Sequence, residues 1–124
     1  MYEVRFRDEK GKTKKLLLEN AGTISEALEI SCGLNFPEES IMGLNLSNVR
    51  EVFTCQTVTN TPLNWYDVTA RSFDEKPVKY HLLFQATNAE DGMKRAMEAM
   101  RQGYEMEPVS IKESGISNVI RDEA

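Results

Sequence analysis

Histidine and cysteine are scarce in this chain of 124 residues, which has one His and two Cys. Cys32 and Cys55 do not form a C-x-x-C motif, and together with His81 they leave too few ligands for a His/Cys zinc site. We therefore predict no metal site and no cofactor. In a reducing compartment the cysteines are free thiols, and we expect Cys32 to be a small buried hydrophobe.

Long apolar runs, targeting signals and phosphate-binding motifs are also missing. No stretch approaches the ~20 apolar residues that cross a bilayer. Residues 1–7 lack the basic start and apolar run of a secretory signal. The chain contains neither G-x-G-x-x-G nor a P-loop. We therefore expect a cytoplasmic protein that makes no membrane contact and has no phosphate-binding loop.

Catalytic constellations are equally sparse. A His-based relay would need His81 beside a hydroxyl or thiol and a carboxylate, but the pattern favours a solvated strand residue next to Lys79. Paired carboxylates fall in turns or at the tail, where a raised pKa is not expected. These pairs are Glu38-Glu39, Asp74-Glu75 and Asp122-Glu123. The sequence therefore predicts that the protein is not an enzyme.

The charge balance is mildly acidic, with 15 Lys+Arg against 20 Asp+Glu and a net charge of −5. This balance disfavours bulk electrostatic binding of nucleic acid or anionic membrane. Hydrophobic residues at 40% and charged residues at 28% fit one soluble domain. A chain of this length buries roughly two-thirds of its unfolded surface, so a core can form without disulfides.

The most informative feature that is present is an internal repeat. Four sets of segments recur in the same order at offsets of 64 to 67 residues. They are residues 2–4 and 66–68, residues 8–10 and 74–76, residues 20–28 and 85–93, and the apolar triplets Val49/Val52/Phe53 and Ile116/Val119/Ile120. We interpret the chain as a tandem duplication.

Each half shows the same succession of strand patterns. Residues 2–6 alternate apolar and charged side chains, which predicts a half-buried strand, and Gly11 suits a hairpin turn before the returning strand at 16–18. In the second half, strands at 66–73 and 78–84 flank a turn. We expect third strands at 41–46 and 109–111. The apolar triplets that follow fit either a short helical turn or a strand extension.

A helix is predicted in the middle of each half. Thr23 and Glu26 have the spacing of a capping box, and Asn88 with Asp91 repeats it more weakly. The expected apolar faces are Ile24, Ala27, Leu28 and Cys32 in the first helix, and Ala89, Met93, Ala96, Met97 and Met100 in the second. The methionine stripe suits an adaptable protein-binding surface or a core, and the helical spacing favours the core.

These elements predict an α+β fold, a single domain over residues 1–124 made of two ββαβ repeats. We place the first unit at residues 1–53, a linker at 54–64, the second unit at 65–120 and a tail at 121–124. A unit of ~60 residues struggles to bury a sheet face alone, so we expect the two to share one core. We expect antiparallel sheets, or one continuous sheet, with two helices packed on one side in pseudo-two-fold symmetry.

Three segments resemble an uncharacterised family of Bacteroidetes bacteria and their phages, a domain of unknown function with a duplicated ββαβ unit. They are Trp65 to Ala70, Phe84 to Asn88 and Val109 to Ser114. The resemblance covers nearly the whole chain, although Gly92 stands where an Ala-like residue would favour the helix. It implies a phage or mobile-element setting rather than a chemistry.

A basic hairpin stands out in the acidic chain, formed by Arg5, Arg7, Lys10, Lys12, Lys14 and Lys15. These residues are the candidate binding site. Clustered cations can contact nucleic acid despite the net charge. Alternatively, they form a solvated hairpin whose lysines protect an edge strand from pairing, and the pattern favours this second interpretation.

The leading functional hypothesis is a small non-enzymatic binding or adaptor protein of phage or mobile-element origin. It would bind a host or phage protein through its surfaces and form a homodimer through its edge strands. A specific version is a counter-defence (anti-CRISPR type) inhibitor, whose acidic charge complements a basic nucleic-acid channel. The alternative is a nucleic-acid-binding accessory protein that uses the basic hairpin.

Overall fold

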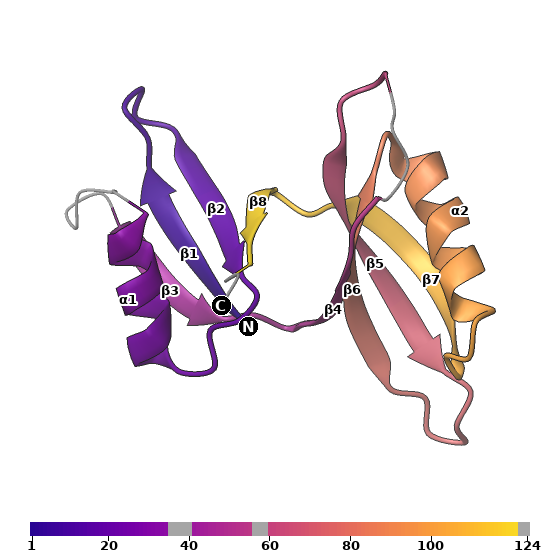
Figure 1. Cartoon of the computed structure of the whole chain (residues 1–124). Helices are drawn as coiled ribbons and strands as arrows, with labels where there is room; N and C mark the ends of the chain where they lie inside the picture. Colours follow the sequence, from indigo (N-terminus) through magenta and orange to yellow (C-terminus); the bar gives the residue numbers. More distant parts are fainter. Residues whose placement is uncertain (35–40, 56–59, 122–124) are drawn as a thin grey trace. The chain divides into compact units, whose positions relative to one another are not determined.

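The structure is a computed structural model and describes residues 1–34, 41–55 and 60–121. Within these residues it contains two helices and eight strands arranged in two sheets, so the predicted α+β class is confirmed (Figure 1). The chain divides into two compact units. Unit 1 comprises residues 1–47 and 115–124, and unit 2 comprises residues 48–114.

The sheet of unit 1 has four strands in the order β3-β1-β2-β8. Their bounds are β1 Tyr2–Arg7, β2 Thr13–Leu18, β3 Ile41–Leu46 and β8 Ile116–Ile120. β1 runs antiparallel to β2 and β3, whereas β8 lies parallel to β2. The predicted hairpin turn forms between β1 and β2. Asp8 Oδ1 accepts the N–H of Lys10 and of Lys12, and Gly11 has a φ of +79°.

Helix α1, Ile24–Gly33, begins at the predicted cap residue. The N–H of Glu26 donates to Thr23 Oγ1 at 3.2 Å, as a capping box requires. The Glu26 carboxylate accepts the N–H of Gly22 at 3.0 Å instead of that of Thr23. The sequence pattern therefore located the helix start correctly and missed the partner of the Glu26 side chain by one residue.

The buried face of α1 differs from the predicted one. Ala27 and Ser31 are fully buried, while Leu28 is 43% exposed and Cys32 is exposed. The Ser31 hydroxyl donates to the Ala27 carbonyl at 2.7 Å, which allows a polar side chain into the core. The prediction of a buried Cys32 is wrong because the helix turns its small residues toward the sheet. The core of unit 1 combines this face with Val4, Phe6, Leu16, Leu18 and Ala21.

The sheet of unit 2 also has four strands, in the order β4-β6-β5-β7. Their bounds are β4 Val49–Phe53, β5 Asn64–Ser72, β6 Lys79–Ala86 and β7 Met106–Glu113. β5 runs antiparallel to β6 and β7, and β4 lies parallel to β6. The sheet is mixed, like that of unit 1, because one edge strand of each runs parallel to its neighbour.

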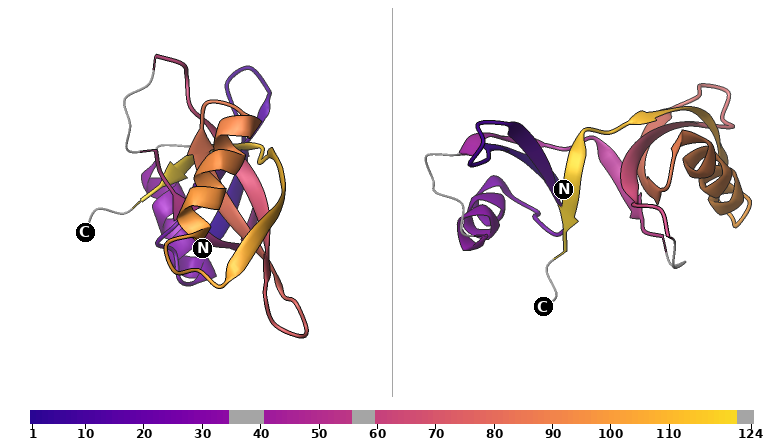
Figure 2. Two further views of the ribbon diagram at one scale, coloured as in Figure 1. Left: turned by 90° about the vertical axis from the view of Figure 1, so that its right-hand side faces the viewer. Right: turned by 90° about the horizontal axis from the view of Figure 1, so that it is seen from above.

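Helix α2, Ala89–Met100, lies along one face of this sheet and packs on β7, β6 and β5 (Figure 2). Asn88 Oδ1 accepts the N–H of Asp91 at 2.8 Å, which confirms the predicted cap. Ala96 and Met100 are buried as predicted, whereas Met97 is 48% exposed. The core also contains Val68, Ala70, Leu82, Phe84 and Met106.

Two organisational predictions need correction. The sheets are mixed instead of antiparallel. The apolar triplets form strands β4 and β8, and each strand pairs in the other half's sheet: β4 with β6, and β8 with β2. The predicted contiguous units 1–53 and 65–120 are therefore wrong, because the last strand of each half belongs to the unit formed by the other half. The predicted linker 54–64 connects β4 to β5 inside unit 2, with residues 56–59 outside the described part. Of the predicted tail 121–124, only residue 121 is described.

Gly92 explains how closely α2 approaches its sheet. A Cβ at this buried position would lie 2.6 Å from Ile111 Cδ1, 3.6 Å from the Cβ of Ala86 and 3.7 Å from the Cβ of Tyr66. The first of these is the mobile end of a side chain, whereas the other two atoms are fixed to the backbone. A single methyl group can therefore be accommodated by a shift of Ile111, but a larger side chain cannot.

We predict that Gly92→Val lowers the free energy of unfolding by about 2–3 kcal/mol because it overpacks the helix–sheet contact. Gly92→Ala should change it by less than about 1 kcal/mol, since its better helix propensity offsets the shift of Ile111. Urea unfolding followed by the fluorescence of Trp65, the sole tryptophan, measures both. Lys94→Val on the exposed face of α2 is the control, and equal midpoints for the two Val variants would refute the packing argument.

Candidate functional site

The structure brings only part of the predicted basic site together on one surface. Arg5 lies opposite Lys15 and Arg7 opposite Thr13 in the β1–β2 ladder, so these side chains share the sheet face that α1 does not cover. Lys14 lies opposite Phe6 and is on the helix side. Lys10 and Lys12 are exposed in the turn. Three cations therefore share one face of the hairpin, two lie at its tip and one is on the other face.

Carboxylates neutralise two of these six cations. Lys14 Nζ lies 3.6 Å from Asp8 Oδ2, and Lys15 Nζ lies 3.8 Å from Glu3 Oε2. The N–H of Lys12 is the main cause that lowers the pKa of Asp8, supported by the N–H of Lys10 and the Lys14 ammonium. Among the ion pairs of the described residues, none involves Arg5, Arg7, Lys10 or Lys12. Four of the six hairpin cations therefore have no ion pair with any residue that the structure describes.

His81 has a carboxylate partner that the sequence pattern did not reveal. Its Nδ1 lies 3.2 Å from Asp67 Oδ1, and Thr69 is opposite His81 in the β5–β6 ladder. This group lies on the face of the sheet that α2 does not cover, since Val68 and Leu82 point to the helix side.

Within the described ranges, His, Cys, Asp and Glu side chains form no group of three that could hold a metal ion, and no helix is long and apolar enough to span a membrane.

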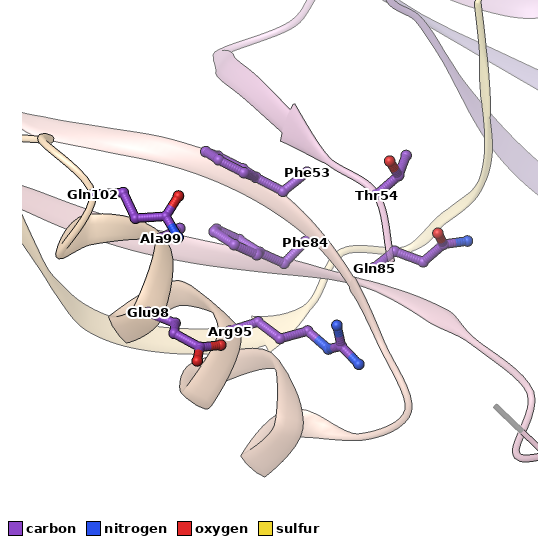
Figure 3. Close-up of a pocket in the computed structure, with 8 residues that line it drawn as sticks. All are labelled: Phe53, Thr54, Phe84, Gln85, Arg95, Glu98, Ala99 and Gln102. Atoms are coloured by element: carbon purple, nitrogen blue, oxygen red, sulfur yellow. The ribbon is translucent and has the colours of Figure 1, made fainter. Parts of the chain in front are cut away.

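A hollow of about 440 Å³ opens where α2 leaves the edge of the unit 2 sheet uncovered (Figure 3). Its floor is the ring of Phe53 stacked on that of Phe84, with centroids 4.3 Å apart and planes 4° from parallel. Arg95, Glu98 and Gln102 on or just after α2 form the opposite wall. Phe53 was predicted only as part of an apolar triplet, so the sequence did not indicate this hollow.

The Arg95 side chain at this hollow is held by the start of its own helix. Asp91 Oδ2 accepts the Nε–H of Arg95 at 3.1 Å and both the N–H and the hydroxyl of Thr87, at 3.0 and 3.1 Å. The Thr87 N–H is the largest cause that lowers the pKa of Asp91, and the Asp91 carboxylate in turn raises the pKa of Arg95. With Asp91 and Glu98 beside Arg95, the hollow has no net positive charge to attract an anion.

Tyr104 closes the other side of the stacked rings. Its ring meets that of Phe53 edge-on, with centroids 5.9 Å apart, and its hydroxyl donates to the Glu51 carboxylate at 2.8 to 2.9 Å. That hydrogen bond raises the pKa of Tyr104. The contact ties the segment after α2 to the edge strand β4, so the rings of Phe53 and Phe84 are held in a fixed position.

A second depression, which we name the Met97 groove, lies on the other side of Tyr104 and has a volume of about 220 Å³. Its lining is largely apolar and comes from the end of α2, the start of β7 and the residue after β5. Met97 is 48% exposed and Phe73 is 67% exposed at this groove. The lining consists of Phe73, Met97, Met100, Arg101, Tyr104, Met106, Glu107 and Pro108.

The methionine stripe predicted on α2 therefore has two roles. Met100 is only 7% exposed and belongs to the core, as favoured, whereas Met97 opens into the groove. Phe73, Met106 and Pro108 complete the groove from distant points of the chain. No sequence pattern indicated that these residues meet, because the β5–β7 register decides it by pairing Ser72 with Met106.

Comparisons with models of protein families, with curated proteins and with solved structures find no match for this chain. The resemblance to the uncharacterised family of Bacteroidetes and their phages therefore stays a prediction.

We predict that Asp91→Asn destabilises unit 2 at neutral pH and that the effect fades in acid. Folding lowers the pKa of the Asp91 carboxyl from its unfolded value of 3.8, so the ionised group stabilises the fold when the pH is above 3.8. This stabilisation is lost as the pH falls through the lower pKa of the folded state. Urea midpoints followed by Trp65 fluorescence between pH 7 and pH 2.5 should show the wild type and the variant converging. Glu90→Gln, an exposed change in the same helical turn, is the control, and a gap that is independent of pH would contradict the assignment.

Proposed function

We propose that the protein is a non-enzymatic binding protein that docks a segment of a partner protein in the Met97 groove. The observation that carries this proposal is the exposure of two large apolar side chains, Phe73 and Met97, at one depression. Single exposed apolar residues are ordinary on protein surfaces, but a cluster of them around a concavity is typical of interaction sites.

The composition of the groove suits a peptide segment better than a small molecule. Methionine side chains are unbranched and polarizable, so Met97, Met100 and Met106 can adapt to different apolar side chains. The depression of about 220 Å³ is smaller than an ordinary small-molecule pocket of ~300–1,000 Å³ but can accept one or two side chains. Tyr104 and Phe73 flank it with aromatic surface of the kind enriched in interface cores.

The charge at the groove specifies the partner further. Glu107 at the rim is already paired with Arg71. Arg101, also at the rim, takes part in none of the ion pairs between residues that the structure describes. An apolar segment with a neighbouring Asp or Glu would fill the groove and compensate Arg101. We therefore propose an acidic-apolar peptide segment as the occupant.

The proposal includes the setting suggested by the sequence. In a phage or mobile-element context, a host protein would supply this segment, and the chain would act as an adaptor or a counter-defence inhibitor.

Homodimer formation through an edge strand is a separate proposal. β7 is an edge of its sheet and contains Pro108, which lacks an N–H and limits strand addition there.

A second candidate function is nucleic-acid binding by the basic hairpin. The observation that favours it is the gathering of Arg5, Arg7 and Lys15 on one sheet face, with Lys10 and Lys12 at the adjoining tip. Residues 2–18 contain six basic and three acidic side chains, a local net charge of +3 in a chain of −5. Such a surface would contact phosphates without reading bases.

For the groove, we predict that selection from a random peptide library on the wild-type protein yields segments with two apolar residues and an adjacent acidic residue. Met97→Glu should weaken their binding at least tenfold, because it places a charge where apolar side chains dock. Arg101→Glu should weaken it through repulsion of the acidic residue. Fluorescence anisotropy of labelled selected peptides measures both effects.

Leu28→Glu is the matched control, since Leu28 is a comparably exposed apolar residue on helix α1. It should leave peptide affinity unchanged. Circular dichroism establishes that each variant is folded. Selected peptides that bind Met97→Glu and the wild type equally well would place the interaction elsewhere and exclude this groove.

For the hairpin, we predict that wild-type protein binds labelled single-stranded DNA or RNA at low salt and that Arg5→Gln/Arg7→Gln/Lys12→Gln binds it more weakly. If three phosphate contacts disappear, the slope of log K against log salt should decrease by about 2. Lys76→Gln/Lys79→Gln/Arg101→Gln in unit 2 removes the same number of exposed charges and serves as control. Equal binding by the two triple variants, or no binding by the wild type, would reject this function.

A further inference from the structure

Each sheet is completed by a strand from the other half of the chain. β8, near the C-terminus, lies parallel to β2 in unit 1, and β4, from the first half, lies parallel to β6 in unit 2 (Figure 1). The other three strands of each sheet are contributed by one half alone. The two halves therefore exchange their last strands reciprocally.

The two exchanged strands are paired in the same register. Leu17 lies opposite Val119 and Leu83 opposite Val52, positions related by offsets of 66 and 67 residues. The next residues also correspond, with Leu18 opposite Ile120 and Phe84 opposite Phe53. Both parallel ladders skip one residue, Ser117 in β8 and Arg50 in β4, at the same offset of 67.

The antiparallel parts of the two sheets match in the same way. Val4 lies opposite Leu16 and Leu44, and Val68 lies opposite Leu82 and Ile111. The ladder to the other edge strand has one register shift in each sheet, which leaves Met42 of β3 and Val109 of β7 without a ladder partner at the same offset of 67. The backbone hydrogen bonds just after the third strands also correspond. The N–H of Ser47 donates to the carbonyl of Met1, and the N–H of Ser114 donates to the carbonyl of Trp65.

The exchange is a consequence of short connections. Ser47 and Asn48 are the whole connection from β3 to β4, and Ser114 and Gly115 that from β7 to β8. β3 runs parallel to β2, because both are antiparallel to β1. A fourth strand beside β2 and parallel to it would thus have to start at the opposite end of the sheet from the end of β3, with β1 and β2 lying between the two strands. Such a parallel crossover needs a dozen or more residues, so β4 cannot take the position beside β2 in its own sheet.

We infer that the two units are copies of one ββαββ module that is completed only by the last strand of a second copy, and that this chain fuses two such copies as mutual partners. The partner surface is the edge of β2 or β6, which the exchanged strand covers in this chain. The kind of partner that fits it is a parallel strand with two adjacent apolar residues at its end, such as Val119-Ile120 or Val52-Phe53.

The exchanged strands are buried where they join the foreign sheet. Val52 is 9% exposed, and Phe53 stacks on Phe84 of β6. In unit 1, Ile116 is 8% exposed and Ile120 packs on the core. Separating the two halves would expose these side chains together with the backbone edges of β2 and β6.

The first experiment cuts the folded chain between its halves. A protease site inserted after Asn60, which is exposed, allows cleavage of the full-length protein between β4 and β5. We expect the two fragments to co-elute in native size-exclusion chromatography at the position of the intact 14.1 kDa chain and to separate only in urea. Fragments that separate under native conditions would overturn the reciprocal exchange.

The second experiment tests whether the exchanged strands are equivalent. In the uncut chain, Ile116→Val/Ser117→Arg/Asn118→Glu/Ile120→Phe gives β8 the residues of β4, and unit 1 should stay folded by circular dichroism and amide exchange. The reversed order, Ile116→Phe/Ser117→Val/Asn118→Glu/Val119→Arg/Ile120→Val, has the same composition and should lose protection in β2. Equal protection in both variants, or loss in both, would refute the equivalence of the two strands.

Discussion

The length of two connections is the constraint on which this fold depends. Because only two residues separate β3 from β4 and β7 from β8, neither fourth strand can reach the parallel position beside its own hairpin. Each strand instead pairs in the other sheet, which makes both sheets mixed and interleaves the two units along the chain. A ββαβ unit of ~60 residues would be marginal alone, and the exchange gives each sheet a fourth strand without lengthening either half.

The placement of α2 on its sheet determines where the surface of unit 2 is hollowed. The helix packs most closely over β7, where the missing side chain of Gly92 allows close approach to Ile111. As a result it does not cover β4, and the stacked rings of Phe53 and Phe84 remain at an open hollow. At the other end, the last turn of α2 leaves Met97 beside Phe73 and creates the apolar groove. The position of α2 on the sheet thus produces both the hollow at Phe53 and the Met97 groove. Of these two, only the groove combines a largely apolar lining with Arg101, a rim cation that has no ion pair among the described residues.

Local patterns predicted the local structure, and non-local pairing escaped them. Alternation identified β1 and β6, and the turn signals beside them placed β2 and β5. The spacing of Thr23–Glu26 and Asn88–Asp91 identified both helix starts. The triplet Val49/Val52/Phe53 fitted a helix turn as well as a strand, and nothing local specifies which sheet it joins. The α1 face was misassigned because Leu28 and Cys32 are apolar but exposed, whereas Ser31 is polar but satisfied by its own helix. The groove was missed because Phe73 and Pro108 are neighbours only through sheet register.

Matched registers allow the surfaces of the two units to be compared position by position, and the comparison shows where they differ in chemistry. Lys14 and Lys15 in unit 1 correspond to Tyr80 and His81 in unit 2. The first pair lies opposite Phe6 and Arg5, and the second lies opposite the equivalent positions, Ala70 and Thr69. Arg7 corresponds to Arg71, which Glu107 neutralises, whereas Arg7 is paired with no described carboxylate. The buried positions of the hairpins are apolar in both units because the core requires it, while the exposed ones are largely cationic in unit 1 and mixed in unit 2. The two hairpins therefore present different charges on exposed faces whose backbones are paired alike.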